Sequence, residues 1–309
     1  CTQVVRTVTV ADDDAPVITD ATGDLTLGTG DTYVGNLNGI SVSDNVDTLT
    51  TEDIVITGDT VDTAVPGTYT INYNVSDSAG NAATQVVRTV TVADDDAPVI
   101  TDATGDLTLG TGDTYVGNLN GISVSDNVDT LTTEDIVITG DTVDTAVPGT
   151  YTINYNVSDS AGNAATQVVR TVTVADDDAP VITDATGDLT LGTGDTYVGN
   201  LNGISVSDNV DTLTTEDIVI TGDTVDTAVP GTYTINYNVS DSAGNAATQV
   251  VRTVTVADDD APVITDATGD LTLGTGDTYV GNLNGISVSD NVDTLTTEDI
   301  VITGDTVDT

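Results

Sequence analysis

The sequence contains no lysine, histidine, methionine, tryptophan or phenylalanine, and only four arginines and one cysteine. Against these four positive charges stand 51 acidic residues, and the formal net charge of the 309-residue chain is -47. Nucleic acids and anionic membrane surfaces attract proteins through lysine and arginine, so both are repelled by this chain. No run approaches 18 uninterrupted apolar residues, so we expect neither a nucleic-acid partner nor insertion into a membrane.

The same absences exclude most catalytic chemistry. Without histidine the usual general base is missing, and a single cysteine cannot build the histidine or cysteine sites of zinc proteins. Without lysine there is no Schiff base, no P-loop and no isopeptide staple between lysine and asparagine. Aspartate pairs could act as in glycosidases, but they recur identically along the chain and no tryptophan or phenylalanine is present to stack on a sugar. We therefore expect the protein not to be an enzyme.

What remains is a chain that is suited to β-structure. Hydrophobic residues make up 38% of the sequence, with valine, isoleucine and threonine abundant, and the mean hydropathy is +0.03. That composition favours strands that bury a core over disorder, despite the charge. The aromatic residues are ten tyrosines, so the predicted core is small and mainly aliphatic.

A long internal repeat decides the organisation of the chain. The segment TQVVRTVTVADDDAP begins at Thr2, Thr84, Thr166 and Thr248, and the sequence between these points is identical in every copy that can be compared. The step of 82 residues is typical of a small autonomous domain and long for a solenoid repeat. The predicted divisions are a closing strand of a preceding repeat at 1–10, repeats at 11–92, 93–174 and 175–256, and a truncated repeat at 257–309.

The visible exception to this identity is Cys1, which stands where the other copies carry alanine. A lipidated cysteine at a mature N-terminus is one interpretation. A single divergent residue in an adjacent repeat is the interpretation that we favour, because the position is an ordinary one in the repeat. We expect the sequence to be a window cut from a longer array.

Within a repeat, apolar and polar residues alternate with the period of a strand. The alternation is clear at 4–10 and at 69–75, and shorter runs at 17–19, 24–27, 39–43 and 54–57 are separated by turn sequences such as TGTGD, NLNG and VPGT. No segment has an apolar stripe with helical spacing. Several short strands in about 80 residues predict a two-sheet antiparallel β-sandwich.

The motifs DDDAPVI, SDNVD, PGTYTINYNVSDSAGNAA and VVRTVTV resemble the bacterial immunoglobulin-like repeats of surface proteins, the hyalin-repeat-like group. The resemblance covers every repeat. The acidic linker that ends in Ala-Pro is also similar to the calcium linkers of cadherins. The resemblance implies an all-β protein of tandem immunoglobulin-like antiparallel β-sandwiches that form an extended rod.

Chain direction brings three acidic clusters to one end of each sandwich. The first strand leaves the linker and the second returns, so the loop that closes the second strand lies at the linker end. The last strand runs to the far end, so the turn that precedes it also lies at the linker end. Each such end combines the linker triplet, two loop aspartates, and the Asp and Asn of the SDSAGN turn. Glu52 and Asp53 lie within reach of it.

Seven oxygen-bearing side chains at one junction repel one another unless a cation joins them, and Ca²⁺ takes six to eight oxygen ligands. Mg²⁺ prefers fewer protein ligands, and softer metals prefer nitrogen or sulfur. We therefore predict calcium sites formed by Asp12, Asp13, Asp14, Asp44, Asp47, Asp77 and Asn81; by Asp94, Asp95, Asp96, Asp126, Asp129, Asp159 and Asn163; by Asp176, Asp177, Asp178, Asp208, Asp211, Asp241 and Asn245; and by Asp258, Asp259, Asp260, Asp290 and Asp293.

The alternative interpretation of these residues is a solvated acidic surface, since aspartate is common in turns. The acidic residues are 47 Asp and 4 Glu, whereas charging a surface would use both, which favours the calcium interpretation at the junctions. The solvated interpretation is preferred for Asp20, Asp24, Asp31, Asp59 and Asp62. Arg88, the sole cation of its repeat, is expected to pair with a neighbouring carboxylate, and the tyrosines are expected to pack in the core or on the sheets.

Identical repeats indicate that length is what the array supplies. We expect the structural extender or stalk of a secreted or cell-surface bacterial adhesin, located outside the cell, in which neighbouring repeats are joined stiffly by Ca²⁺. The alternative is a subunit of a self-assembling extracellular filament, with identical chains as partners. It is suggested by the unpaired closing strand at 2–10 and by a last repeat that lacks its final two strands.

Overall fold

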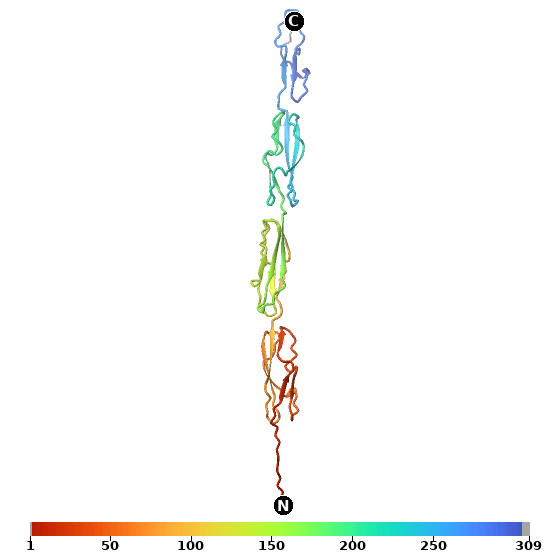
Figure 1. Ribbon diagram of the computed structural model, residues 1–309. Coiled ribbons are helices and arrows are strands. Elements are labelled where there is room, and N and C mark those ends of the chain that lie inside the picture. Colours follow the sequence, from red (N-terminus) through yellow and green to blue (C-terminus); the bar gives the residue numbers. More distant parts are fainter. Residues whose placement is uncertain (1, 305–309) are drawn as a thin grey trace. The chain divides into compact units, whose positions relative to one another are not determined.

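The computed structural model describes residues 2–304, and its elements are strands and short 3₁₀ helices (Figure 1). Cys1, for which two interpretations were open, lies outside the described residues. The chain divides into two compact units, which are described separately: the first holds the residues up to Thr173 except 110–113 and 145–148, and the second holds the remainder.

Each complete repeat has the same six strands. In the first repeat they are β1 (Val17–Asp20), β2 (Leu25–Gly28), β3 (Ile40–Ser43), β4 (Val55–Gly58), β5 (Gly67–Asn74) and β6 (Val86–Ala93), with the 3₁₀ helix η1 (Thr51–Asp53) before β4. The second has β7 (Val99–Asp102), β8 (Leu107–Gly110), β9 (Ile122–Ser125), β10 (Val137–Gly140), β11 (Gly149–Asn156) and β12 (Val168–Ala175). The third has β13 (Val181–Asp184), β14 (Leu189–Gly192), β15 (Ile204–Ser207), β16 (Val219–Gly222), β17 (Gly231–Asn238) and β18 (Val250–Ala257).

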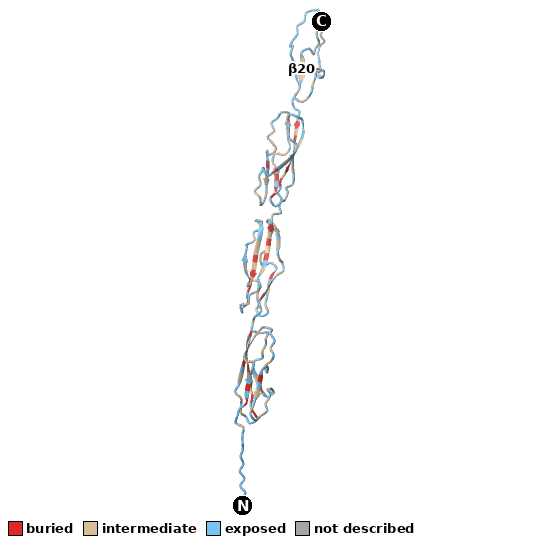
Figure 2. Ribbon diagram, turned by 45° about the vertical axis from the view of Figure 1, so that its right-hand side comes forward, coloured by how far each residue is buried: buried red, intermediate tan, exposed pale blue. Residues whose placement is uncertain are grey.

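Two sheets form the sandwich of each complete repeat. In the first repeat β1 pairs with β3, and a four-stranded sheet has the order β2-β6-β5-β4. Ile18 and Ile40 of the smaller sheet share a buried cluster with Ile71, Tyr73 and Val90 of the larger one. Figure 2 shows such buried residues inside each of the first three repeats. The prediction of tandem immunoglobulin-like β-sandwiches is confirmed.

The sequence predicted a sandwich that is antiparallel throughout, and this part of the prediction is wrong. β2 pairs with β6 in parallel, with Leu25 opposite Val90, while β5 pairs antiparallel with both β6 and β4. The reason is that a turn at 21–24 carries the chain from the smaller sheet to the larger one without reversing its direction. β1 and β2 therefore run the same way as the last strand of the repeat.

The described part of the fourth repeat has β19 (Val263–Asp266), β20 (Ile286–Ser289) and the 3₁₀ helix η2 (Thr297–Asp299). β19 and β20 pair as β1 and β3 do. Residues 2–16 contain no strand, although 4–11 have the sequence of β6. In the first repeat that strand is paired with β2 and β5.

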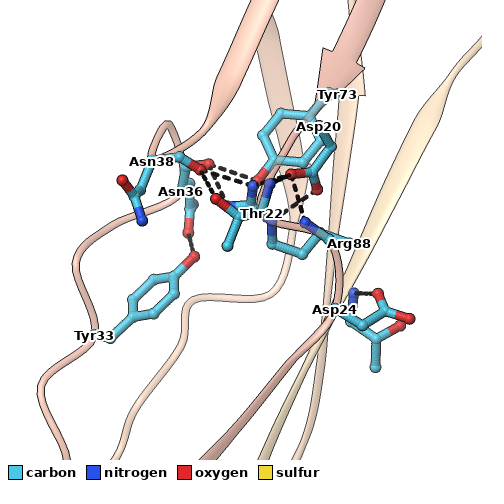
Figure 3. A network of polar contacts seen from close by, with 10 residues as sticks. Asp20, Thr22, Asp24, Tyr33, Asn36, Asn38, Tyr73 and Arg88 are labelled. Carbon is cyan, nitrogen blue, oxygen red and sulfur yellow. Dashed lines mark hydrogen bonds and ion pairs between the residues drawn. The ribbon is translucent and has the colours of Figure 1, made fainter.

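Each complete repeat contains a buried ion pair between an aspartate and an arginine, and Figure 3 shows that of the first repeat, Asp20 and Arg88. Strand alternation turns Arg88 inward beside Val90, and its side chain is fully buried. The guanidinium donates from Nε to Asp20 Oδ2 (2.9 Å), from a terminal nitrogen to Asp20 Oδ1, and to the carbonyl oxygens of Asn36 (3.1 Å) and Asn38 (2.8 Å). It also lies 5.6 Å from the centroid of the Tyr73 ring. The predicted pairing of Arg88 with a carboxylate is confirmed.

The expectation that Asp20 is a solvated turn residue is wrong. Its side chain is only 8% exposed. The pairing is not evident from the sequence because the partner, Arg88, lies 68 residues further along the chain. Asp20 Oδ1 also accepts from the backbone N–H groups of Thr22 (3.0 Å) and Gly23 (2.9 Å). The carboxylate therefore holds the turn that transfers the chain between the two sheets.

This ion pair predicts acid sensitivity. The bonds from Arg88 hold the pKa of Asp20 below its ordinary value, and the bonds from Gly23 and Thr22 act in the same direction against the effect of burial. A lowered pKa adds stability that is complete above the unfolded-state pKa of about 3.9 and is lost as the pH falls through the folded-state value. We expect the urea concentration at the unfolding midpoint to decrease as the pH is lowered below about 4. The decrease should be smaller in a variant with asparagine at Asp20, Asp102 and Asp184. Midpoint curves that run parallel from pH 7 to pH 2 for both proteins would contradict this assignment.

Candidate metal centre

The linker end of each repeat gathers carboxylates from three separate segments. In the second repeat Asp94 follows β6 directly, Asp126 and Asp129 lie in the loop after β9, and Asp159 lies in the turn between β11 and β12. Groups of three carboxylates, drawn from these four positions, have ligand oxygens within 4.8 Å of one another. They are Asp12, Asp44 and Asp77; Asp94, Asp129 and Asp159; Asp176, Asp208 and Asp211; and Asp258, Asp290 and Asp293.

The turn residue of the cluster is the most buried. Asp159 is 8% exposed. Its Oδ1 accepts from the backbone N–H groups of Gly162 and Asn163 (2.7 Å each), and its Oδ2 accepts from Asn163 Nδ2 at 2.8 Å. Burial acts to raise the pKa of Asp159, but these bonds outweigh it and the pKa lies below the ordinary value. Asp159 is therefore held in its ionised form.

The loop carboxylates are aimed by local hydrogen bonds. Asp126 Oδ2 accepts from the N–H groups of Val128 (2.9 Å) and Asp129 (2.8 Å), an arrangement that closes the loop on itself. Asp129 reaches across to the neighbouring turn, where Oδ2 accepts from Ser160 N (2.6 Å) and Oδ1 from Ser160 Oγ (3.1 Å). Ser160 thus joins the two loops, a role that the sequence analysis missed, although the serine stands inside the SDSAGN motif.

The linker residue is the one whose charge is least compensated. Burial raises the pKa of Asp94, and the charges of Asp126, Asp159 and Asp129 raise it further, against a bond from the Asp96 N–H. Asp94 Oδ2 and Asp126 Oδ1 are inaccessible to solvent and have no hydrogen-bond partner. The same is true of Asp12 Oδ2, Asp44 Oδ1, Asp208 Oδ1 and both carboxylate oxygens of Asp176. Bare buried oxygens among like charges have the chemistry that a hard cation satisfies.

The structure does not bring all predicted ligands together. Among the described residues, the clusters do not include the second and third aspartates of the linker, which are Asp13, Asp14, Asp95, Asp96, Asp177, Asp178, Asp259 and Asp260. The predicted asparagine takes part as a hydrogen-bond donor: Asn163 Nδ2 binds Asp159 and also the backbone oxygen of Asp94 at 3.1 Å, and Asn81 and Asn245 do the same in their repeats. The asparagine therefore fastens the linker to the turn.

The residues predicted to lie within reach of the site behave differently. Asp53 Oδ2 accepts from Thr50 N (2.7 Å) and Thr50 Oγ1 (3.0 Å), so this carboxylate caps η1. Glu52 is exposed on the same 3₁₀ helix, and neither residue joins the clusters found among residues 2–304.

No helix of the described residues is both long and apolar enough to cross a lipid bilayer.

The fold and the junctions define a class of protein, the tandem immunoglobulin-like β-sandwich with an acidic cluster at each linker. The comparison with protein families agrees: the model of the bacterial surface protein Ig-like domain matches residues 20–92, 102–174 and 184–256. The chain belongs to this family.

Curated relatives are more distant. The chain is 26% identical to the pesticidal crystal protein Cry22Aa of Bacillus thuringiensis over 251 residues, and the aligned region covers 80% of this chain and 31% of that protein. It is 30% identical over 222 residues to an uncharacterized 81.3 kDa protein of Acholeplasma phage L2, covering 69% and 29%. The chain thus spans less than a third of the length of these relatives.

Among solved structures, the chain is similar to the extracellular domain of protocadherin GammaB4, with a TM-score of 0.35 and 15% identity over 84% of this chain and 53% of the other. It is also similar to repeats EC22–24 of mouse cadherin-23, with a TM-score of 0.31 and 12% identity over 80% and 100% of the two chains.

Proposed function

We propose that this chain is part of the stalk of a bacterial adhesin that is secreted or displayed on the cell surface. Membership of a family of bacterial surface domains supports a location outside the cell. Near-identical repeats support a role in which the number of repeats sets a length, since no repeat differs enough to carry a separate recognition site. A stalk of this kind projects other parts of its protein away from the surface that bears them.

We further propose that each acidic cluster binds Ca²⁺. The observation that carries this proposal is the set of buried carboxylate oxygens without hydrogen-bond partners, which face like charges from two loops and the linker. Burying ionised oxygens without a donor is unfavourable, and a cation offsets both the lost hydration and the repulsion. Hard oxygen donors from several segments suit Ca²⁺, which accepts more protein ligands than Mg²⁺ does.

A bound ion would act on the linker. Asp94 follows β6 with no intervening residue, and Asp126, Asp129 and Asp159 belong to the next repeat. An ion held by these residues would restrict the backbone between one β-sandwich and the next. The consequence is a stalk that is stiff where calcium is abundant and looser where it is scarce, because the like charges at each junction would then repel one another.

Native mass spectrometry and titration calorimetry of the 309-residue chain test the calcium proposal. We expect one Ca²⁺ per cluster and weaker binding of Mg²⁺. Changing Asp94→Asn should remove one ion, because it replaces a ligand of a single cluster. The matched control is Asp106→Asn, which removes the same charge from an exposed residue that accepts only from Thr171 N in the structure. Absence of binding heat with millimolar Ca²⁺, or equal ion loss in both variants, would reject the proposal.

Self-assembly into a filament stays a prediction.

A further inference from the structure

The three linker aspartates have three different environments. Asp94 lies in the acidic cluster of the second repeat. Asp95 turns back to the first repeat, where its carboxylate lies against Gly28, the last residue of β2. A Cβ atom on Gly28 would be only 2.3 Å from Asp95 Oδ1 and 2.4 Å from Oδ2. The position therefore requires a residue without a side chain if Asp95 is to keep its place.

Asp96 belongs to a separate set of contacts. Asn127 Nδ2 donates to Asp96 Oδ2 at 2.7 Å and to Thr29 Oγ1 at 3.0 Å, and Thr29 Oγ1 lies 3.4 Å from the same carboxylate oxygen. Thr29 follows β2 of the first repeat, whereas Asn127 lies in the loop after β9 of the second. All three residues lie inside the first compact unit.

The contacts use the donors of the asparagine fully. A side-chain amide carries two N–H protons, and here each has an acceptor, one neutral and one charged. Equivalent contacts occur inside the second compact unit: Asn209 donates to Thr111 (2.9 Å) and Asp178 (2.8 Å), and Asn291 donates to Thr193 (2.8 Å) and Asp260 (2.7 Å). In the first repeat Asn45 keeps the bond to its linker, Asp14, at 2.7 Å.

We infer that Thr29, Asp96 and Asn127 form a latch that joins consecutive repeats without an ion, and that the partner of this surface is the next copy of the same domain. Asn127 of the second repeat donates hydrogen bonds both to the linker, at Asp96, and to Thr29, which follows β2 of the first repeat. Gly28 lies beside the latch, where the carboxylate of Asp95 occupies the space that a Cβ atom would take. The latch uses the third linker aspartate, which the acidic cluster does not include.

The latch explains why the linker is a uniform triplet of aspartates. The first serves the cluster, the second packs on glycine, and the third accepts from the asparagine. Asn127 stands between Asp126 and Asp129 in one loop, so the latch and the cluster are neighbours but have no side chain in common.

Distance measurements between spin labels across one junction test the latch. Labels would be placed at two exposed threonines of equivalent edge strands, Thr57→Cys in β4 and Thr139→Cys in β10, in the full chain with Cys1→Ser. In EGTA, Asn127→Ala and Thr29→Ala should each broaden the distance distribution about twofold, as expected when hydrogen bonds of modest net worth are lost. The matched control is Thr26→Ala, an exposed threonine of β2 that makes none of these contacts.

Equal widths for the labelled parent and both variants in EGTA would overturn the latch. Broadening by Asn127→Ala alone would also overturn it, because that result would reflect a disturbed loop. Thr29 lies outside the acidic cluster, so broadening by Thr29→Ala cannot arise from lost ion ligands. Adding Ca²⁺ to the labelled parent tests the calcium proposal separately. If the variants broaden the distance distribution in EGTA but Ca²⁺ does not narrow that of the parent, the latch is supported and the calcium proposal is not.

Discussion

Alanine at Asp20, Asp102 and Asp184 is expected to destabilise each complete repeat by about 3–5 kcal/mol, because it leaves a buried arginine without its carboxylate. The arginine side chain is fully buried, so solvent does not reach it to take the place of the lost partner. The carbonyl oxygens of Asn36 and Asn38 stay in place, but neutral acceptors do not balance the guanidinium charge. The measurement is urea unfolding of the 309-residue chain, with all three complete repeats substituted so that they shift together.

The loss of unfolding free energy in the alanine variant should be larger than the loss from removing the carboxylate charge alone. The same substitution removes the acceptor for the N–H groups of Thr22 and Gly23, which shape the turn between the two sheets. The matched control is alanine at the exposed Asp62, Asp144 and Asp226, for which we expect less than about 1 kcal/mol. If both sets of substitutions lower the urea midpoint equally, the ion pair is not the main polar support of the core.

A second variant separates the charge from the packing. Adding Arg→Met at Arg88, Arg170 and Arg252 to the alanine variant should restore part of the lost stability, because an unpaired charge no longer has to be buried. Methionine also refills much of the space beside Tyr73 with apolar atoms. Failure of the combined variant to recover any stability would show that the turn geometry, and not the buried charge, accounts for the loss.

The strands were predictable from the sequence because one face of each is buried. The alternation of 69–75 predicted the inward positions of Ile71 and Tyr73, and both side chains are fully buried in the structure. Alternation carries no information about strand direction, which is why the parallel pair of β2 and β6 was not predicted. It also could not identify Asp20 as the partner of Arg88, because the two residues meet only through the pairing of distant strands.

The acidic cluster was predictable in outline from chain direction. The linker, the loop after β3 and the turn before β6 do meet, as the trio of Asp12, Asp44 and Asp77 shows. The linker triplet could not be resolved in the same way, because neighbouring side chains of an extended segment point in opposite directions. Asp95 accordingly faces Gly28 while Asp94 faces the cluster, and the sequence Asp-Asp-Asp gives no sign of this difference.

The loop carboxylate of the cluster allows a test in which one substitution has opposite effects with and without calcium. Asp44 Oδ2 accepts from the N–H groups of Val46 and Asp47 (2.8 Å each), while Oδ1 is buried and has no partner. Asparagine can keep the accepting oxygen and place an NH₂ group where the bare oxygen lies. That group can donate to the surrounding carboxylates, whereas the original oxygen repels them.

Asparagine at Asp44, Asp126 and Asp208 should therefore stabilise the repeats in EGTA, raising the melting temperature by about 5 °C. In calcium the order should reverse. A ligand present at a thousand times its dissociation constant stabilises the native state by about 4 kcal/mol, and the variant forfeits most of this gain because an amide is a poorer calcium ligand than a carboxylate. Thermal melts of both proteins in EGTA and in Ca²⁺ give the four values needed. A variant that is less stable in EGTA and equally stabilised by Ca²⁺ would contradict both the repulsion within the cluster and the proposed ligand role of these aspartates.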